Sequence, residues 1–168
     1  MGKQSSFFGV DPDPEVRYLI FHDESGSYVP GGGDRWLVHG VLLVPFVYLA
    51  RCLSILGEVR KTTGFQNELH FASLRKSATG PKGSCVAGWL DAYARILSDR
   101  CAFHVLAVDT RSSGFDQSKY SDPHYVYNSF ARTAIVGAIA WSLKDESRVA
   151  VSICSHERRR KASDNFAT

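Results

Sequence analysis

Two adjacent acidic residues at the end of an apolar run are the first candidates for chemistry. The segment "YLIFHDESGS" carries Asp23 and Glu24 out of a run of apolar residues into a Ser-Gly turn. A buried carboxylate is costly unless it has a partner, which could be a structural donor, a basic side chain or a metal ion. Asp109 follows the apolar run "FHVLAV" in the same way, and Glu68 lies within "NELHF". These acids could therefore build a site for a divalent cation.

Magnesium and manganese prefer oxygen ligands, and two-metal phosphoryl chemistry needs several carboxylates that converge around the ions. Asp23, Asp109 and Glu68 are the candidates for such a set. The alternative is structural, because aspartate often caps a turn or opens a loop at the end of a strand. Spacing alone favours this structural alternative for Asp23 and Asp109.

The elements that must position these acids follow from the hydrophobic periodicity. Apolar runs predict four strands, at residues 16–22, 36–44, 103–108 and 149–154. Helical spacing predicts three helices, near 46–60, 84–98 and 123–143, with Ser84 and Asp122 as N-caps.

The order of these elements predicts an α/β fold with one mixed β-sheet flanked by helices. The Gly-rich loop between the first two strands favours an antiparallel hairpin, and the later alternation of strands and helices favours parallel pairing by crossover. Residues 1–15 read as a flexible lead-in, and residues 16–168 as a single domain. Sheets of this kind place their sites at the carboxyl ends of parallel strands, where Asp23 and Asp109 are expected.

Bulk composition narrows the class of protein only a little. The 168 residues are 44% apolar and 22% charged, with a net charge of +3, which permits a nucleic-acid partner without arguing for one. No run resembles a signal peptide or a membrane span, so we expect a cytoplasmic protein without a membrane partner. The four cysteines show no C-x-x-C pair and are expected to be buried free thiols.

The motif "FHDESGS", followed by the strand "WLVHGVLLVP" and then by "NELHF" after a helix, resembles the family called domain of unknown function 3800. The resemblance spans about Tyr18 to Cys154. It implies a ribonuclease-H-like fold and a metal-dependent nuclease that hydrolyses nucleic-acid phosphodiesters with Mg²⁺ or Mn²⁺. The family's acidic pair falls on Asp23 and Glu24, and its Glu-x-His on Glu68 and His70.

In this interpretation Asp23, Glu24, Glu68 and His70 are the catalytic residues, and Asp23, Glu68 and Asp109 hold the metal. His70 is suited to act as a general acid or base near neutral pH, or it only hydrogen-bonds Glu68 or the backbone. His22 is expected to be a packed core histidine, and His39 and His104 are expected to be structural residues within strands. The basic segment Arg158–Lys161 is expected to be a solvated tail that could instead contact phosphates.

The sequence departs from the family pattern at its C-terminal end. Members continue to a helix with a "Q-x-A-D"-like motif that brings the last acid, and no such motif occurs before Thr168. We therefore expect a C-terminally incomplete domain, or a protein partner that completes the fold or the site, with Glu157 a weak substitute. The alternative function is a non-catalytic interaction subunit of a larger assembly that retains the fold. A phosphatase- or transferase-like enzyme on the same scaffold is a third hypothesis.

Overall fold

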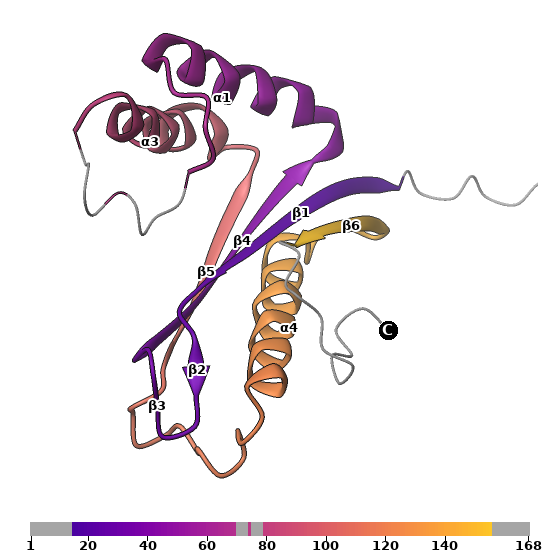
Figure 1. Ribbon diagram of the computed structural model, residues 1–168. Coiled ribbons are helices and arrows are strands. Elements are labelled where there is room, and N and C mark those ends of the chain that lie inside the picture. The colour runs from indigo at the N-terminus through magenta and orange to yellow at the C-terminus, as the bar shows by residue number, and fades with distance from the viewer. Residues whose placement is uncertain (1–14, 70–73, 75–78, 156–168) are drawn as a thin grey trace, which may run out of the picture. The chain divides into compact units, whose positions relative to one another are not determined.

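The computed structural model describes residues 15–69, 74 and 79–155 (Figure 1). By its internal contacts the chain divides into two compact units, and each is described by itself. The first unit contains the described residues up to Val41 and those from His104 onward. The second unit is the segment Leu42–Phe103.

Four strands form one sheet in the order β5-β4-β1-β6. Their bounds are Val16–Ser25 for β1, Trp36–Pro45 for β4, Ala102–Asp109 for β5 and Val149–Ser155 for β6. Strand β6 pairs parallel with β1, while Figure 1 shows β4 running in the opposite direction to β1. The sheet is therefore mixed, and the prediction that the four apolar runs share one sheet is confirmed.

The connection between β1 and β4 is a small hairpin of its own. Within it, β2 (Tyr28–Val29) and β3 (Gly32–Gly33) form a two-stranded antiparallel sheet. Gly26, directly after β1, has a φ of +95°, a left-handed conformation that favours glycine. The Gly-rich loop thus makes the expected hairpin, with a two-stranded extension that the sequence pattern did not indicate.

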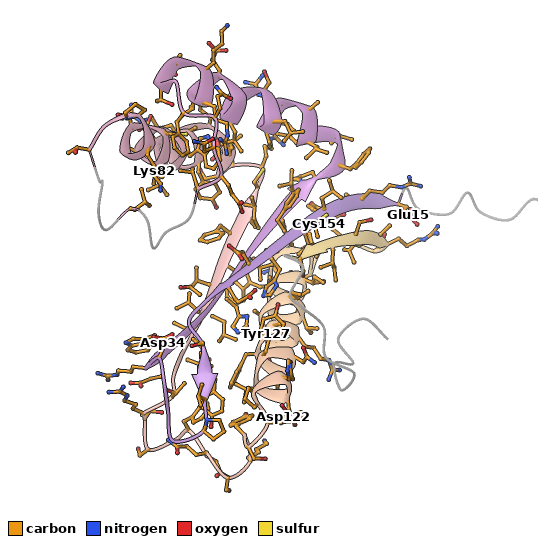
Figure 2. All side chains as sticks on the ribbon, viewed as in Figure 1. Glu15, Asp34, Lys82, Asp122, Tyr127 and Cys154 are labelled. Atoms are coloured by element: carbon orange, nitrogen blue, oxygen red, sulfur yellow. The ribbon has the colours of Figure 1, made fainter. Side chains whose placement is uncertain are left out.

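Helix α4 (Pro123–Ser142) begins as the sequence predicts. The Asp122 side chain accepts a hydrogen bond of 2.8 Å from the backbone N–H of His124, and Pro123 occupies the first turn (Figure 2). Val126 is fully buried and packs with Tyr28 and Leu37. Small residues let this helix approach the sheet closely, since three alanines on its inner side are buried: Ala131, Ala134 and Ala138.

The second unit contains a helical pair. A single 3₁₀ turn (Phe46–Tyr48) leads into α1 (Leu49–Thr63), and α3 (Pro81–Ala92) continues into a π-helical turn (Tyr93–Leu97). The indole Nε1 of Trp89 on α3 donates a hydrogen bond of 3.0 Å to the carbonyl of Leu56 on α1. No helix among the described residues is long and apolar enough to cross a membrane.

The predicted N-cap at Ser84 is wrong, because α3 begins three residues earlier. Gly80 is the N-cap residue and Pro81 takes the first helical position, where its fixed φ and missing N–H fit the helix start. Ser84 instead lies inside the first turn, and its N–H donates a hydrogen bond of 3.0 Å to the carbonyl of Gly80.

All four cysteines are free, as expected, but only three of them are buried. Cys154 lies exposed on β6 (Figure 2), which corrects the expectation that every thiol is buried. In the second unit the Sγ atoms of Cys52 and Cys101 lie 3.6 Å apart. Burial, with the neighbouring Cys52 thiol adding to the effect, raises the pKa of Cys101 to about 12. That thiol is therefore a poor nucleophile in the folded protein.

The burial of three cysteines and the exposure of Cys154 predict how many thiols react with a reagent in the folded protein. At neutral pH a thiol reagent such as dithionitrobenzoate is expected to modify one cysteine per folded chain rapidly, and all four after denaturation. The Cys154→Ser variant should lose the rapid reaction while keeping the slow ones. Rapid modification of two or more thiols in the folded wild type would contradict the burial of Cys52, Cys85 and Cys101.

Candidate functional site

The adjacent acids Asp23 and Glu24 point to opposite faces of the sheet. Along β1, Ile20 and His22 are buried while Phe21 and Asp23 are exposed. Since successive side chains of a strand alternate between the two faces, Glu24 shares the face of His22. The acidic pair of the sequence is thus divided, with one carboxylate on each side of β1.

Glu24 is held by a tyrosine from α4. The hydroxyl of Tyr127 donates a hydrogen bond of 3.2 Å to Glu24 Oε2. The Tyr127 ring also lies beside two histidine rings, with centroid distances of 6.3 Å to His22 and 5.8 Å to His39 (Figure 2 labels Tyr127). Helix α4 therefore brings a phenol to the face of the sheet on which Glu24 lies.

The two histidines contact each other directly. His22 on β1 and His39 on β4 are 3% and 2% exposed, and their rings stack with centroids 5.4 Å apart. The distance from His22 Nε2 to His39 Nδ1 is 3.1 Å, within the range of a hydrogen bond. His22 was expected to be a packed core histidine and His39 a structural residue, and both are buried, but their contact with each other was not foreseen.

Ser155 completes this group from β6. The parallel register places Ser155 beside His22, and its Oγ lies 3.4 Å from His22 Nδ1. We call the five residues the β1 polar cluster: His22, Glu24, His39, Tyr127 and Ser155. Its members come from three neighbouring strands and one helix of the first unit, so no local sequence motif joins them.

A small pocket adjoins the β1 polar cluster. Its walls include Glu24, His39 and Tyr127, together with Tyr28 and the start of α4 at Pro123. The space open to water is about 20 Å³, enough for roughly one water molecule. The hydroxyl of Tyr28 is buried and has no hydrogen-bond partner among the described residues. A water molecule buried in this pocket would supply a hydrogen-bond partner to the Tyr28 hydroxyl.

Asp109 is bound by an arginine. The Arg35 guanidinium contacts both carboxylate oxygens, with Nη2 at 2.8 Å from Oδ2 and Nε at 3.2 Å from each oxygen. This hydrogen bonding, helped by the Arg111 backbone N–H, holds the pKa of Asp109 below its usual range. The Arg35 guanidinium also lies 5.3 Å from the centre of the Trp36 ring. Asp109, at the end of β5, is therefore an ionised carboxylate whose charge is balanced by the Arg35 guanidinium.

The Arg35–Asp109 pair predicts a pH-dependent contribution to stability. Because the folded pKa of Asp109 is lowered, its contribution is present above the unfolded pKa of about 4 and is lost as the pH falls through the folded pKa. We expect Arg35→Gln to lower the urea midpoint slightly at pH 7, and the difference from wild type to shrink by pH 2–3.

The control for this pair is Arg17→Gln, which removes a more exposed pair with Glu15. Exposed pairs contribute little, so its urea midpoint should match that of wild type at both pH values. A difference between Arg35→Gln and wild type that stayed constant from pH 7 to pH 2 would contradict the predicted role of Asp109.

Asp23 and Asp109 lie on the same face of the sheet but not on adjacent strands. Val108 packs in the core beside α4, so alternation puts Asp109 on the face opposite α4, which is also the face of Asp23. Strand β4 lies between β1 and β5, and two strand spacings amount to roughly 9.5 Å. Asp109 would have to leave Arg35 and lean across β4 to share an ion with Asp23.

The remaining predicted site residues are Glu68, His70 and Glu157. Glu68 is exposed in an irregular stretch of the second unit, and the two units are described separately. His70 and Glu157 lie outside the described residues. The predicted convergence of Glu68 with Asp23 stays a prediction.

Within residues 15–69, 74 and 79–155, no three histidine, cysteine, aspartate or glutamate side chains are grouped so that they could hold a metal ion. Asp23 and Asp109 of the first unit therefore do not form such a group by themselves, and the metal site stays a prediction.

Comparison of the sequence and the structure with protein-family models, with curated proteins and with solved structures gave no match.

Proposed function

We propose that the protein hydrolyses nucleic-acid phosphodiesters with the help of a divalent cation, on a ribonuclease-H-like sheet. The observation that carries this proposal is the position of Asp23 and Glu24 at the carboxyl end of β1, beside the end of its parallel partner β6. In α/β sheets this is where binding and catalytic groups gather. The motifs "DESG" and "ELH" add the family resemblance.

The topology supports the proposal. The first long strand lies inside the sheet, between β4 and β6, and the parallel strand β6 is reached through helix α4. Helix α4 connects β5 to β6, which form the two edges of the sheet. A central strand that ends in an acid, next to a parallel strand, is what we expect of a ribonuclease-H-like core.

Asp23 is the residue that we assign to the cation side of the site. Its side chain is exposed, whereas Glu24 on the other face accepts the hydrogen bond of Tyr127. Asp109 is neutralised by Arg35 and is a weaker candidate. Since Mg²⁺ and Mn²⁺ demand several oxygen ligands, the complete set would add further ligands to Asp23, and Glu68 is the candidate that the sequence predicts.

A cleavage assay tests the proposal. The full-length protein would be incubated with single- and double-stranded DNA and RNA, in Mg²⁺, in Mn²⁺ and in chelator. We expect cleavage of at least one substrate with metal and none with chelator. Absence of cleavage of all four substrates in both metals, or cleavage that persists in chelator, would overturn the proposal.

A second candidate is a non-catalytic interaction subunit that retains the fold. The observation that favours it is the neutralised Asp109, together with exposed aromatic side chains on the face of Asp23, namely Phe21 and Trp36. This alternative predicts no metal-dependent cleavage by the wild type. It also predicts little effect of Asp23→Asn on binding of a protein partner.

A further inference from the structure

Two buried cysteines of the second unit face each other. The Sγ atoms of Cys52, in the first turn of α1, and of Cys101, directly before β5, lie 3.6 Å apart. The two residues are 5% and 2% exposed, and both pack in a core cluster with Val44 and Leu97. At this distance the two sulfur atoms are in van der Waals contact. Each side chain therefore already points at the other.

The backbone around Cys101 holds its side chain in this place. Cys101 lies shortly after the π-helical turn Tyr93–Leu97, and its N–H donates a hydrogen bond of 2.7 Å to the carbonyl of Leu97. The Tyr93 hydroxyl donates a hydrogen bond of 3.3 Å to the carbonyl of Cys101. Both partners belong to the π-helical turn, and turns of this kind are frequent at functional sites. Cys101 is thus fixed beside α1 from two directions.

We propose that Cys52 and Cys101 form an oxidative modification site, at which hydrogen peroxide converts the two thiols to a reversible disulfide within the native fold. The link joins the first turn of α1 to the residue before β5. It closes a loop that contains α3 and the predicted site residue Glu68. The modification does not depend on the proposed hydrolase activity, because it involves only the two thiols and the peroxide.

Cys52 is the thiol that reacts with the peroxide. Burial and the contact with Cys52 raise the pKa of Cys101 to about 12, so almost all Cys101 side chains are protonated at neutral pH. The Cys52 thiolate attacks one oxygen of the peroxide, and the O–O bond breaks. Cys52 becomes a sulfenic acid, and the hydroxide that leaves takes up a proton to give water.

The second step joins the two sulfur atoms. The sulfenic acid is uncharged, so the negative charge on Cys52, which helps to raise the pKa of Cys101, is gone. Cys101 loses its proton, its Sγ attacks the Cys52 Sγ, and the S–O bond breaks. The departing hydroxide takes up a proton as water. Contact between the two sulfurs makes this step intramolecular and therefore fast.

The two steps balance. Two thiols and one molecule of hydrogen peroxide give one disulfide and two molecules of water. The two electrons that the sulfur atoms lose reduce the peroxide, and a dithiol reductant reverses the modification by thiol–disulfide exchange.

The burial of the pair selects for a small, uncharged oxidant. Hydrogen peroxide is little larger than water and reaches buried groups through local opening of the structure. Oxidised glutathione is a charged peptide, and exchange requires that its sulfur touch a thiol that is 5% exposed or less. We therefore expect peroxide to form the link in the folded protein, and oxidised glutathione to leave both thiols reduced. Equal reaction with both oxidants would overturn this selectivity.

Peptide mapping after oxidation tests the link. The test protein is the full chain with Cys154→Ser, which removes the exposed thiol that could join two chains. It is treated with peroxide while folded, alkylated in denaturant and cut with trypsin. Cleavage after Arg51 and Arg100 places the two cysteines in different peptides, residues 52–60 and 101–111.

We expect these two peptides to be joined after peroxide treatment, and to separate after treatment with dithiothreitol. Peptides that stay separate, whether alkylated or oxidised to sulfinic acid, would overturn the proposal. Cys85 is the internal control, because it is fully buried but lies outside the contact between Cys52 and Cys101. It should be recovered in alkylated form, and a link that includes Cys85 would contradict the assigned pair.

Two serine variants on the same background test the order of the steps. In Cys101→Ser the sulfenic acid has no thiol to attack it, so we expect dimedone to trap it on Cys52. In Cys52→Ser we expect no dimedone adduct on Cys101. An adduct on Cys101 and none on Cys52 would overturn the assignment of Cys52 as the attacking thiol.

Urea unfolding tests whether the link fits the native fold. A disulfide lowers the conformational entropy of the unfolded chain, and this one joins residues 49 positions apart. We expect the peroxide-treated Cys154→Ser protein to unfold at a higher urea concentration than the reduced protein, and dithiothreitol to reverse the shift. The Cys101→Ser variant should show no such rise. A lower midpoint in the linked protein would show that the disulfide distorts the fold, contrary to the proposal.

Discussion

Replacing Asp23 by asparagine is expected to reduce metal-dependent cleavage by at least about 100-fold while the protein stays folded. Asparagine keeps the shape of the side chain but removes its charge, and Asp23 is exposed on β1, so packing does not depend on it. Stability is expected to stay about the same, because the substitution keeps the shape of an exposed side chain. The measurement is initial cleavage rate against metal concentration, with thermal unfolding of each variant.

The matched control is Asp145→Asn, which removes an exposed charge from the loop between α4 and β6. Its cleavage rate should equal that of the wild type. An active Asp23→Asn variant with an unchanged metal dependence would show that the carboxylate of Asp23 is not part of the site. The interaction-subunit hypothesis would then gain support.

Replacing Gly26 by alanine is expected to cause the largest loss of stability among single methyl additions in the first unit. Gly26 has a φ of +95°, which costs an L-residue about 1–2 kcal/mol. A Cβ at this position would also fall within hard contact of the backbone carbonyl oxygen of Trp36, and neither backbone can move without disturbing the β1–β4 hairpin. We expect a total cost of about 3 kcal/mol or more.

The Gly31→Ala variant separates the conformational cost of a positive φ from the cost of the steric contact with the Trp36 carbonyl. Gly31 has a φ of +75°, but a Cβ there meets nothing within 4 Å, so only the conformational cost of about 1–2 kcal/mol applies. Urea denaturation followed by circular dichroism gives both free energies of unfolding. Equal destabilisation of the two variants would show that the carbonyl of Trp36 does not approach Gly26 as closely as the structure indicates.

Local patterns in the sequence predicted most of the fold. Apolar runs located all four long strands within a few residues, because each strand lies in a sheet with at least one covered face. Asp122 followed by Pro123 located the start of α4, since both residues act locally through the helix end. The prediction of Ser84 as an N-cap was wrong because serine is common at N-caps in general, whereas Pro81, three residues earlier, fits the first turn of the helix better.

The site was less predictable because its contacts join distant residues. The alternation of side chains along β1 already implied that Asp23 and Glu24 face opposite ways, and the burial of His22 and Glu24's contact with Tyr127 agree with this. The pairing of Arg35 with Asp109 spans 74 residues and depends on the strand order, which periodicity does not reveal. The proximity of Ser155 to His22 depends in the same way on the parallel register.

The pairing of β1 with β6 also bears on how the chain folds as it is synthesised. Residues 16–22 meet their partners 149–155 across 133 positions, whereas β1 and β4 are joined by a short hairpin. Contacts between distant residues form slowly, because a long loop must close before they can be made. On the ribosome, therefore, the β1–β4 hairpin can assemble early, with His22 beside His39, while the other side of β1 stays unpaired until residues 149–155 have been made. During this stage the free edge of β1 is exposed, and we expect the protein to need chaperone protection against aggregation most at this point.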